Sequence, residues 1–193
     1  ERRHAGEALR ESEERFSKAF RTSPHPIGIT EVATGRCIEV NDACLNVFGF
    51  RREEVIGNTT LILGIWPNLE ERVRVIERLK AGQPVRNMEF VLKTKSGALR
   101  YLLASADLAE LNGTLCVVTV ANDITERKQA EEALRMSEER FAKAFQASPH
   151  PVVLSELDSG LVVDANDAAC QLFAYHKEEV VGRTTQEIGI WPS

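Results

Sequence analysis

The residues that could do chemistry in this 193-residue chain are few and scattered. The four cysteines, Cys37, Cys44, Cys116 and Cys170, form no CxxC pair and stand at no metal-ligand spacing from a histidine. Each lies in an apolar stretch, which favours small buried residues in a reducing compartment over a metal site. The sequence also has no nucleophile–base pattern, no Gly-x-Gly-x-x-Gly segment and no P-loop pattern. We therefore expect a regulatory fragment that is not an enzyme and holds no metal.

The two tryptophans and two of the histidines stand in matching sequence segments. Trp66 and Trp191, the two tryptophans, both stand in a Gly-Ile-Trp-Pro segment. A tryptophan in an irregular segment either packs over the core or lines a cavity. His25 and His150 each stand between two prolines. Histidine titrates near neutrality, so a pH-sensing role competes here with a plain surface loop.

These pairs belong to a repeat, because residues 126–193 repeat residues 1–68 at an offset of 125 positions. The segment Glu7-Ala-Leu-Arg-Glu-Ser-Glu-Glu-Arg-Phe16 recurs as Glu132-Ala-Leu-Arg-Met-Ser-Glu-Glu-Arg-Phe141, and no gap is needed anywhere. Self-similarity at a fixed period is the signature of an array of similar units. We expect one complete unit, followed by a second that is cut partway, and a further unit before residue 1 in the parent protein.

Composition restricts the partners of the chain. Apolar residues make up 43% and charged residues 27%, as in an ordinary globular protein. The net charge of −5 and the absence of a basic stripe exclude nucleic acid as an expected partner. No apolar run reaches the ~20 residues that span a bilayer. We expect a cytoplasmic fragment without membrane contact, whose parent is free to be anchored elsewhere.

Residues 1–22 have the pattern of a helix. Small and apolar residues recur at alternating spacings of four and three, the seam of a coiled coil. In the first copy they are Ala5, Leu9, Ser12, Phe16 and Ala19, and in the second Ala130, Leu134, Ser137, Phe141 and Ala144. Two interpretations remain open: a linker helix that pairs with its copy in a homodimer, or a helix packed on its own domain.

The region between the two linker helices reads as strands, short helices and strands again. We expect strands at 27–32 and 36–40, a short helix capped by Asn41 or Asp42, a helical turn at 51–56, a helix at 69–81 and strands at 85–95, 99–108 and 115–121. The apolar stripe of the longer helix is Val73, Ile76 and Leu79. This order predicts an α+β fold with a five-stranded antiparallel sheet and helices on one face.

With these residues, the order resembles the PAS domain family with its C-terminal PAC segment. The resemblance is carried by the segments Ser23-Pro24…Pro26, Asn41-Asp42-Ala43, Phe48-Gly49-Phe50, Glu53-Glu54-Val55-Ile56-Gly57, Lys95-Ser96-Gly97 and Asn122-Asp123-Ile124-Thr125-Glu126-Arg127-Lys128. It covers residues 16–125 completely and 141–193 for the first half of a domain. We thus divide the chain into a linker helix (1–22), a complete domain (23–125), a second linker helix (126–147) and a truncated domain (148–193).

The resemblance implies a sensory or relay module of a bacterial histidine kinase or diguanylate cyclase, with a downstream output domain in the parent chain. Such modules bind a small ligand between sheet and helices, or only dimerise, so a ligand-free structural spacer is the alternative. Flavin photochemistry in this family uses a cysteine just after the glycine that ends the middle helices, and Gly57–Ile62 contains none. Haem needs an axial ligand such as histidine, and residues 69–121 contain none. Met88 is a possible axial ligand, but a methionine on an apolar strand is more often part of the core.

The expected pocket wall is apolar. It consists of Met88, Phe90, Leu92 and Leu102, facing Val73 and Ile76, with Trp66 and Asn41 as further candidate contacts. Asn41 is first of all a helix cap. No inward arginine or histidine can be named from the sequence, so we expect either a small apolar ligand or a filled core.

The segment Asp123-Ile124-Thr125 is the expected signal relay into the helix from Glu126. Asp123 is expected to bond backbone N–H groups or an arginine at the helix start, where an acid also suits the helix dipole. The truncated second domain exposes strand edges and half a core, so we expect it to be ordered by packing on another chain or on the first domain.

Overall fold

The structure, a computed structural model, describes residues 2–189 and divides into two compact units, Glu1–Lys128 and Gln129–Ser193. The side chains of Ala5, Leu9 and Ser12 in the predicted seam, and Trp191 in the second Gly-Ile-Trp-Pro segment, lie outside the described residues. Within the described residues, no helix is both long and apolar enough to cross a membrane.

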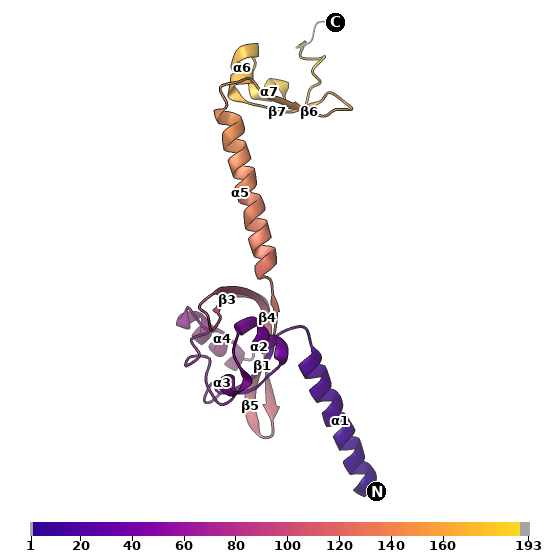
Figure 1. Ribbon diagram of the computed structural model, residues 1–193, viewed down its shortest axis with the longest axis vertical. Helices are drawn as coiled ribbons and strands as arrows, with labels where there is room; N and C mark the ends of the chain where they lie inside the picture. Colours follow the sequence, from indigo (N-terminus) through magenta and orange to yellow (C-terminus); the bar gives the residue numbers. More distant parts are fainter. Residues whose placement is uncertain (1, 190–193) are drawn as a thin grey trace. The chain divides into compact units, whose positions relative to one another are not determined.

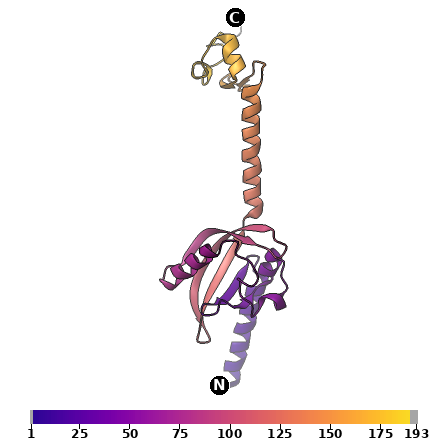
Figure 2. The ribbon, with the colours of Figure 1, turned by 90° about the vertical axis from the view of Figure 1, so that its left-hand side faces the viewer.

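The first unit contains the sheet that the sequence predicts (Figures 1 and 2). Its elements are α1 (Arg2–Thr22), β1 (Ile27–Glu31), β2 (Cys37–Val40), α2 (Asp42–Phe48), α3 (Arg52–Val55), α4 (Leu69–Lys80), β3 (Val85–Lys93), β4 (Leu99–Leu111), β5 (Thr114–Asp123) and the start of α5 (Thr125–Ala147). The five strands pair antiparallel in the order β2-β1-β5-β4-β3. The predicted five-stranded α+β fold is confirmed.

Turn and cap residues determine where several elements of this unit begin and end. Asn112 and Gly113 join β4 to β5 with φ angles of 50° and 76°, the backbone that a tight hairpin of this type requires. Asn41 caps α2 by accepting a hydrogen bond from the N–H of Cys44, and Gly49 ends the helix with φ 75°. These are the positions at which the sequence predicts a hairpin, a cap and a helix end.

The sheet buries a different set of side chains on each face. The inner face packs against α2 and α4 in a core formed by Phe48, Ile65, Leu79, Val85, Phe90, Leu102, Ala104, Ala106, Val117 and Ala121. On the outer face, Phe20 from the end of α1 packs with Ile29 and Cys116. Helix α1 is therefore attached to its own unit at its C-terminal end, while Phe16 one turn earlier is 66% exposed.

The second unit repeats the first half of this arrangement on a smaller core. After α5 come β6 (Val153–Ser155), β7 (Val162–Ala165), α6 (Asp167–Phe173) and α7 (Lys177–Val180). Strands β6 and β7 form a two-stranded antiparallel sheet. The buried residues are Val162, Ala165, Ala169, Val180 and Ile188. Asn166 caps α6 through the N–H of Ala169, as Asn41 caps α2.

Candidate ligand pocket and helix-entry contacts

A cavity of about 450 Å³ lies in the first unit, between the inner face of the sheet and the helices that cover it. Small-molecule sites in proteins typically measure ~300–1,000 Å³. Its apolar wall includes Phe48, Phe50, Val55, Ile65, Trp66, Val75, Ile76, Val85, Phe90, Leu92, Leu102, Ala104, Ala106, Val117 and Ala121. Much of the core of this unit is thus the wall of a cavity.

Five of the predicted wall and contact residues line this cavity: Trp66, Ile76, Phe90, Leu92 and Leu102. The Trp66 and Phe90 rings meet edge to face, with their centroids 5.8 Å apart. Trp66 therefore combines the two roles left open for it, because it packs on the sheet and also borders the cavity.

Asn41 does not line the cavity. The residue is fully buried beneath the entry to β1, where its Oδ1 accepts hydrogen bonds from the backbone N–H groups of Ile27 and Cys44 at 2.9 and 3.0 Å. Its Nδ2 donates to the carbonyl oxygen of His25 at 2.8 Å. The side-chain amide of Asn41 is thus hydrogen-bonded to backbone groups on both its oxygen and its nitrogen, and in this structure it acts as a helix cap.

Val73 and Met88 are corrections to the predicted wall. Their side chains are 48% and 38% exposed and neither lines the cavity. On α4 the inward stripe runs through Arg72, Val75 and Ile76, which places Val73 on the flank of the helix. Met88 follows a bulge in β3, between Val85 and Met88, where the pairing register shifts.

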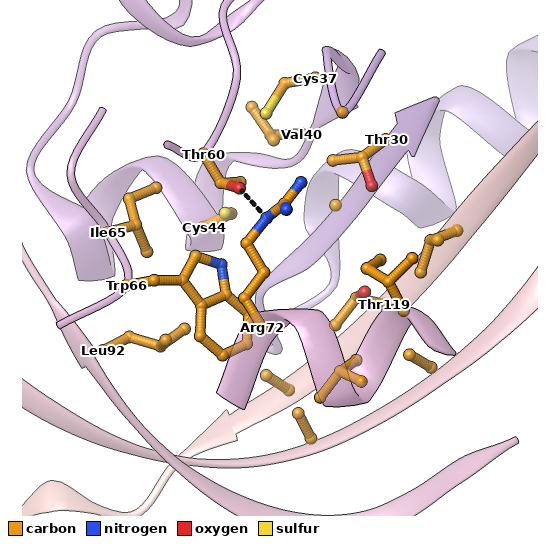
Figure 3. A pocket seen from close by; sticks show the side chains of 18 of the residues that line it. Thr30, Cys37, Val40, Cys44, Thr60, Ile65, Trp66, Arg72, Leu92 and Thr119 are labelled. Atoms are coloured by element: carbon orange, nitrogen blue, oxygen red, sulfur yellow. Dashed lines mark hydrogen bonds between the residues drawn. The ribbon is translucent and has the colours of Figure 1, made fainter. Parts of the chain in front are cut away.

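Arg72 is an inward-pointing residue that the predicted wall does not contain. Its side chain extends from α4 into the pocket, and its Nε donates a hydrogen bond to Thr60 Oγ1 at 3.3 Å (Figure 3). One Nη atom lies 2.9 Å from the place that a Cβ would take on Gly35, so it reaches the turn between β1 and β2. The helical spacing that includes Ile76 also includes Arg72, but a stripe defined by apolar residues alone leaves it out.

The remaining polar groups of the cavity wall are mainly hydroxyls and thiols. Thr30, Thr60 and Thr119 line it, together with Cys37 and Cys44. Burial raises the pKa of the Cys37 thiol and, with a smaller contribution from Cys37, raises the pKa of Cys44 to about 12. Both thiols are therefore protonated at neutral pH, as expected of small buried residues.

The histidines and acids form no metal centre in the part of the chain that the structure describes. No group of three or more His, Cys, Asp and Glu side chains is placed to hold an ion there. His25 is exposed in the loop before β1, where its backbone bonds to the Ser23 hydroxyl.

The start of α5 is attached to the sheet by the residues predicted for the relay. Asp123 Oδ1 accepts hydrogen bonds from the backbone N–H and the hydroxyl of Thr125, and Asp123 Oδ2 lies 3.5 Å from Arg100 Nη1. Thr125 Oγ1 in turn accepts from the backbone N–H of Tyr101 at 2.9 Å. The predicted backbone and arginine partners of Asp123 are both present.

Further contacts join the same helix start to β3 and β4. The N–H of Ile124 bonds to the carbonyl oxygen of Tyr101 at 2.8 Å, and Ile124 is 5% exposed. Lys128 Nζ lies 2.8 Å from Glu89 on β3. The first turn of α5 is therefore fixed to the two strands at one edge of the sheet.

Two family models match the chain. One, described as the PAS fold, matches residues 14–124, and another, described as a PAS domain, matches residues 139–192. The matches correspond to the complete and the partial copy of the repeat.

Two curated relatives are similar over most of the chain. The methyl sulfide methyltransferase-associated sensor of Methanosarcina acetivorans is 29% identical over 140 residues, which cover 71% of this chain and 14% of that protein. The diguanylate cyclase DgcM of Escherichia coli is 27% identical over 125 residues, which cover 62% of this chain and 29% of that protein. The chain thus spans less than a third of the length of either relative.

Solved structures support the fold. The PAS domain of an HTR-like protein from Haloarcula marismortui has a TM-score of 0.51 at 20% identity, and the match covers 63% of this chain and 99% of that one. A domain of a sensory box sensor histidine kinase/response regulator from Geobacter sulfurreducens has a TM-score of 0.50 at 20% identity, over 60% and 96% of the two chains.

Proposed function

The chain belongs to the PAS family, and from that premise we propose that its complete unit is a sensory module that binds a small molecule in the cavity and reports its binding state to α5. The observation that carries the proposal is the cavity of about 450 Å³ inside a domain of ordinary size. Natural cores are packed close to crystal density, with few voids larger than a water molecule. A space of this size, walled by apolar side chains, suits a small-molecule ligand better than water.

The proposed relay follows β5. Thr119 and Ala121 line the cavity from this strand, which ends at Asp123. The Asp123 carboxylate bonds to Thr125, the first residue of α5. A shift of β5 when the cavity fills would therefore move the entry of α5 directly, without an intervening flexible linker.

The partner of α5 in this proposal is a second copy of the chain. Phe141 stacks on Phe145 along the helix, yet Phe141 and Leu134 are 59% and 61% exposed. In α1, Phe16 stacks on Phe20 and is similarly exposed. Pairing with the same helices of another chain would bury these positions and turn movement at the helix start into a change between subunits.

The output belongs to the parent protein and is proposed from its relatives alone. One relative is named as a sensor and the other as a diguanylate cyclase, so a sensor kinase or a cyclase is the proposed parent. The alternative is a ligand-free spacer and dimerisation module in an array. The cavity favours the sensory function over the spacer.

A cavity-filling variant tests the sensory function. Ala106 lines the cavity and is 6% exposed. We expect native mass spectrometry of the freshly purified chain to show a bound small molecule, and we expect its removal to change hydrogen exchange over residues 123–130. Ala106→Leu should abolish both effects while far-UV circular dichroism is kept, and Ala104→Val, a smaller change in the same wall, should weaken them. Ala98→Leu, at an exposed position before β4, is the control.

The spacer function predicts a different set of results. If the protein retains no small molecule, binds none from a metabolite extract, and shows the same exchange pattern in the wild type and Ala106→Leu, the spacer function holds and the sensory proposal is wrong. We do not expect the ligand to be haem or a flavin that forms a cysteine adduct, because residues 69–121 contain no histidine and Gly57–Ile62 contains no cysteine.

A further inference from the structure

The cavity wall is mostly apolar, and one cationic side chain, Arg72, extends into the cavity. Arg72 comes from the inward face of α4 and is only partly exposed. Transfer of a charge into an apolar site is unfavourable unless the charge is paired or hydrogen-bonded. An acceptor that enters such a cavity beside a partly exposed arginine can therefore gain charge-assisted hydrogen bonds.

Within the described residues, the protein offers the Arg72 side chain few hydrogen-bond acceptors. The guanidinium bonds there through Nε to the neutral Thr60 hydroxyl, at 3.3 Å. A guanidinium carries five N–H donors, so the donors on both Nη atoms remain for another acceptor. No carboxylate of the described residues lies within 4 Å of Arg72.

The acid in the cavity wall has a hydrogen-bond donor of its own. Glu31 also lines the cavity, but its carboxylate accepts a hydrogen bond from the Thr34 hydroxyl in the turn after β1. Lys80, the other charged residue of α4 in the wall, is exposed at the far end of the helix. The free donors of Arg72 are thus presented to the cavity itself.

The surroundings of Arg72 hold the side chain in place and leave its tip accessible. The Thr60 hydroxyl holds one edge of the guanidinium through Nε, and Figure 3 shows the side chain extended into the pocket rather than folded back along α4. Gly35 leaves room at the tip, because a Cβ there would lie 2.9 Å from an Nη atom. A guanidinium fixed through Nε offers its two Nη groups as a planar fork, which matches the two oxygens of a carboxylate.

From these contacts we infer that the ligand is a small amphipathic monocarboxylate, whose carboxylate pairs with Arg72 and whose apolar body lies against the wall that includes Trp66, Phe90 and Leu102. The inference rests on the proposed function and goes beyond it by naming the class of ligand. One inward arginine beside neutral hydroxyls and the acidic Glu31 suits a single negative charge, whereas a phosphate dianion would call for further cationic donors. The apolar remainder of the wall requires an aliphatic or aromatic body instead of a second acid.

Matched acid and amide probes test this assignment. Trp66 borders the cavity, and Trp191→Phe leaves it as the sole tryptophan, so its fluorescence reports binding. The probes are 3-phenylpropionate with 3-phenylpropanamide, and octanoate with octanamide. We expect each acid to bind about 10- to 100-fold more tightly than its amide, the range for a hydrogen-bonded charge.

Substitutions on α4 locate the effect. Arg72→Met keeps the length of the side chain and should lower the affinity of the acid to that of the amide, with the affinity of the amide retained. Arg72→Lys should retain a part of the preference, because it keeps the charge but not the fork. Arg74→Met, an exposed arginine on the same helix, is the control and should change neither affinity.

The outcomes separate the inference from the function on which it rests. Equal affinity for acid and amide, or an acid preference that survives Arg72→Met, overturns the carboxylate assignment and leaves the sensory function intact. Tighter binding of phenyl phosphate than of the acids also overturns it. If neither acid binds saturably, the carboxylate assignment is wrong, and the bound-molecule and Ala106→Leu measurements then decide separately whether the cavity binds anything else.

Discussion

The two copies of the repeat are alike in local structure and different in what they enclose. In the first copy the elements of the closing half, α4 and β3–β5, complete a core that contains a cavity of about 450 Å³. In the second, the described elements enclose a hollow of about 10 Å³. The hairpin and short helices common to both are therefore a scaffold that supplies the part of the pocket wall from Pro26 to Trp66, and the closing half adds the part from Arg72 to Ala121.

Equivalent residues make the same local contacts in both copies. The β-bridge between Arg36 and Thr59 recurs between Leu161 and Thr184. At the turn glycines the surroundings differ: a Cβ on Gly35 would meet Arg72 at 2.9 Å, whereas a Cβ on Gly160 would meet the Thr185 hydroxyl at 3.5 Å. Short-range sequence thus determines the turn, and the closing half determines whether a charged group faces it.

The largest effect expected from this comparison is at the buried asparagines. Asn41 and Asn166 are both fully buried, and each accepts two backbone hydrogen bonds at 2.9–3.0 Å, one from a helix N–H and one from the N–H of Ile27 or Val152 at the entry to the first strand. Asn41→Ala should lower the free energy of unfolding of the first unit by about 2–4 kcal/mol, because it removes a cap and leaves buried backbone groups unpaired. Native-state hydrogen exchange measures the loss in β1, β2 and α2.

Asn166→Ala tests whether this role depends on a pocket. We expect a similar loss of protection in β6, β7 and α6, although no comparable cavity adjoins them. Asn41→Asp and Asn166→Asp should fall between alanine and wild type, because the acceptor remains and the donor is lost. An effect at Asn41 alone, together with a change in ligand affinity, would instead favour the ligand-contact role left open by the sequence.

The next effect concerns the residue that ends the first short helix in each copy. Gly49 ends α2 with φ 75°, and Ala174 ends α6 with φ 57°. A left-handed backbone is unfavourable for alanine by about 1 kcal/mol relative to glycine. A Cβ on Gly49 would meet no atom within 4 Å, so the strain is confined to the backbone.

Substituting each of these two residues by the other should therefore change the free energy of unfolding in opposite directions. Gly49→Ala is expected to destabilise the first unit by about 1 kcal/mol, and Ala174→Gly to stabilise the second by about the same amount. Hydrogen exchange in each unit, at fixed pH and temperature, gives both values in the 193-residue chain. A change of the same sign at both positions would show that side-chain packing, and not the backbone, decides there.

The sequence alone predicts most of the fold, because its strongest signals are local. Asparagine caps, the Asn112-Gly113 hairpin and the alternation of the strands follow from short-range chemistry, and each is where the sequence places it. The repeat adds a check, since an element that recurs after 125 positions is rarely a chance pattern.

The pocket is only partly predictable, because its wall depends on a bulge and on the rotation of one helix. The register shift before Met88 in β3 leaves that side chain exposed, and no sequence motif predicts the shift. Rotation of α4 places Arg72 inward and Val73 on the flank. A search for apolar residues alone cannot find Arg72, although a helical projection of residues 69–80 that includes charged residues shows it in line with Ile76.

The smallest expected effect lies at an ion pair that only the closing half can supply. Glu54 lies in a helical turn common to both copies, but its partner Lys95 follows β3, with Nζ 2.7 and 2.8 Å from the two carboxylate oxygens. This hydrogen bond to Lys95 is the largest cause that lowers the pKa of Glu54 to about 2, and the N–H of Arg51 is the next. Because the pKa in the folded protein lies below the ordinary value, the pair stabilises the fold fully above about pH 4.5 and loses this contribution as the pH falls toward 2.

Glu54→Gln should therefore make the first unit slightly less stable at pH 7 and should flatten the decrease in its thermal midpoint between pH 4.5 and 2. The difference is small because the pair lies at the surface, where solvent screens it. Lys95→Met should give only a part of this flattening, because the N–H of Arg51 still lowers the pKa of Glu54, and the double variant should behave like Glu54→Gln. Equal slopes in wild type and Glu54→Gln across this pH range would show that the contact with the closing half contributes nothing to the stability of the scaffold.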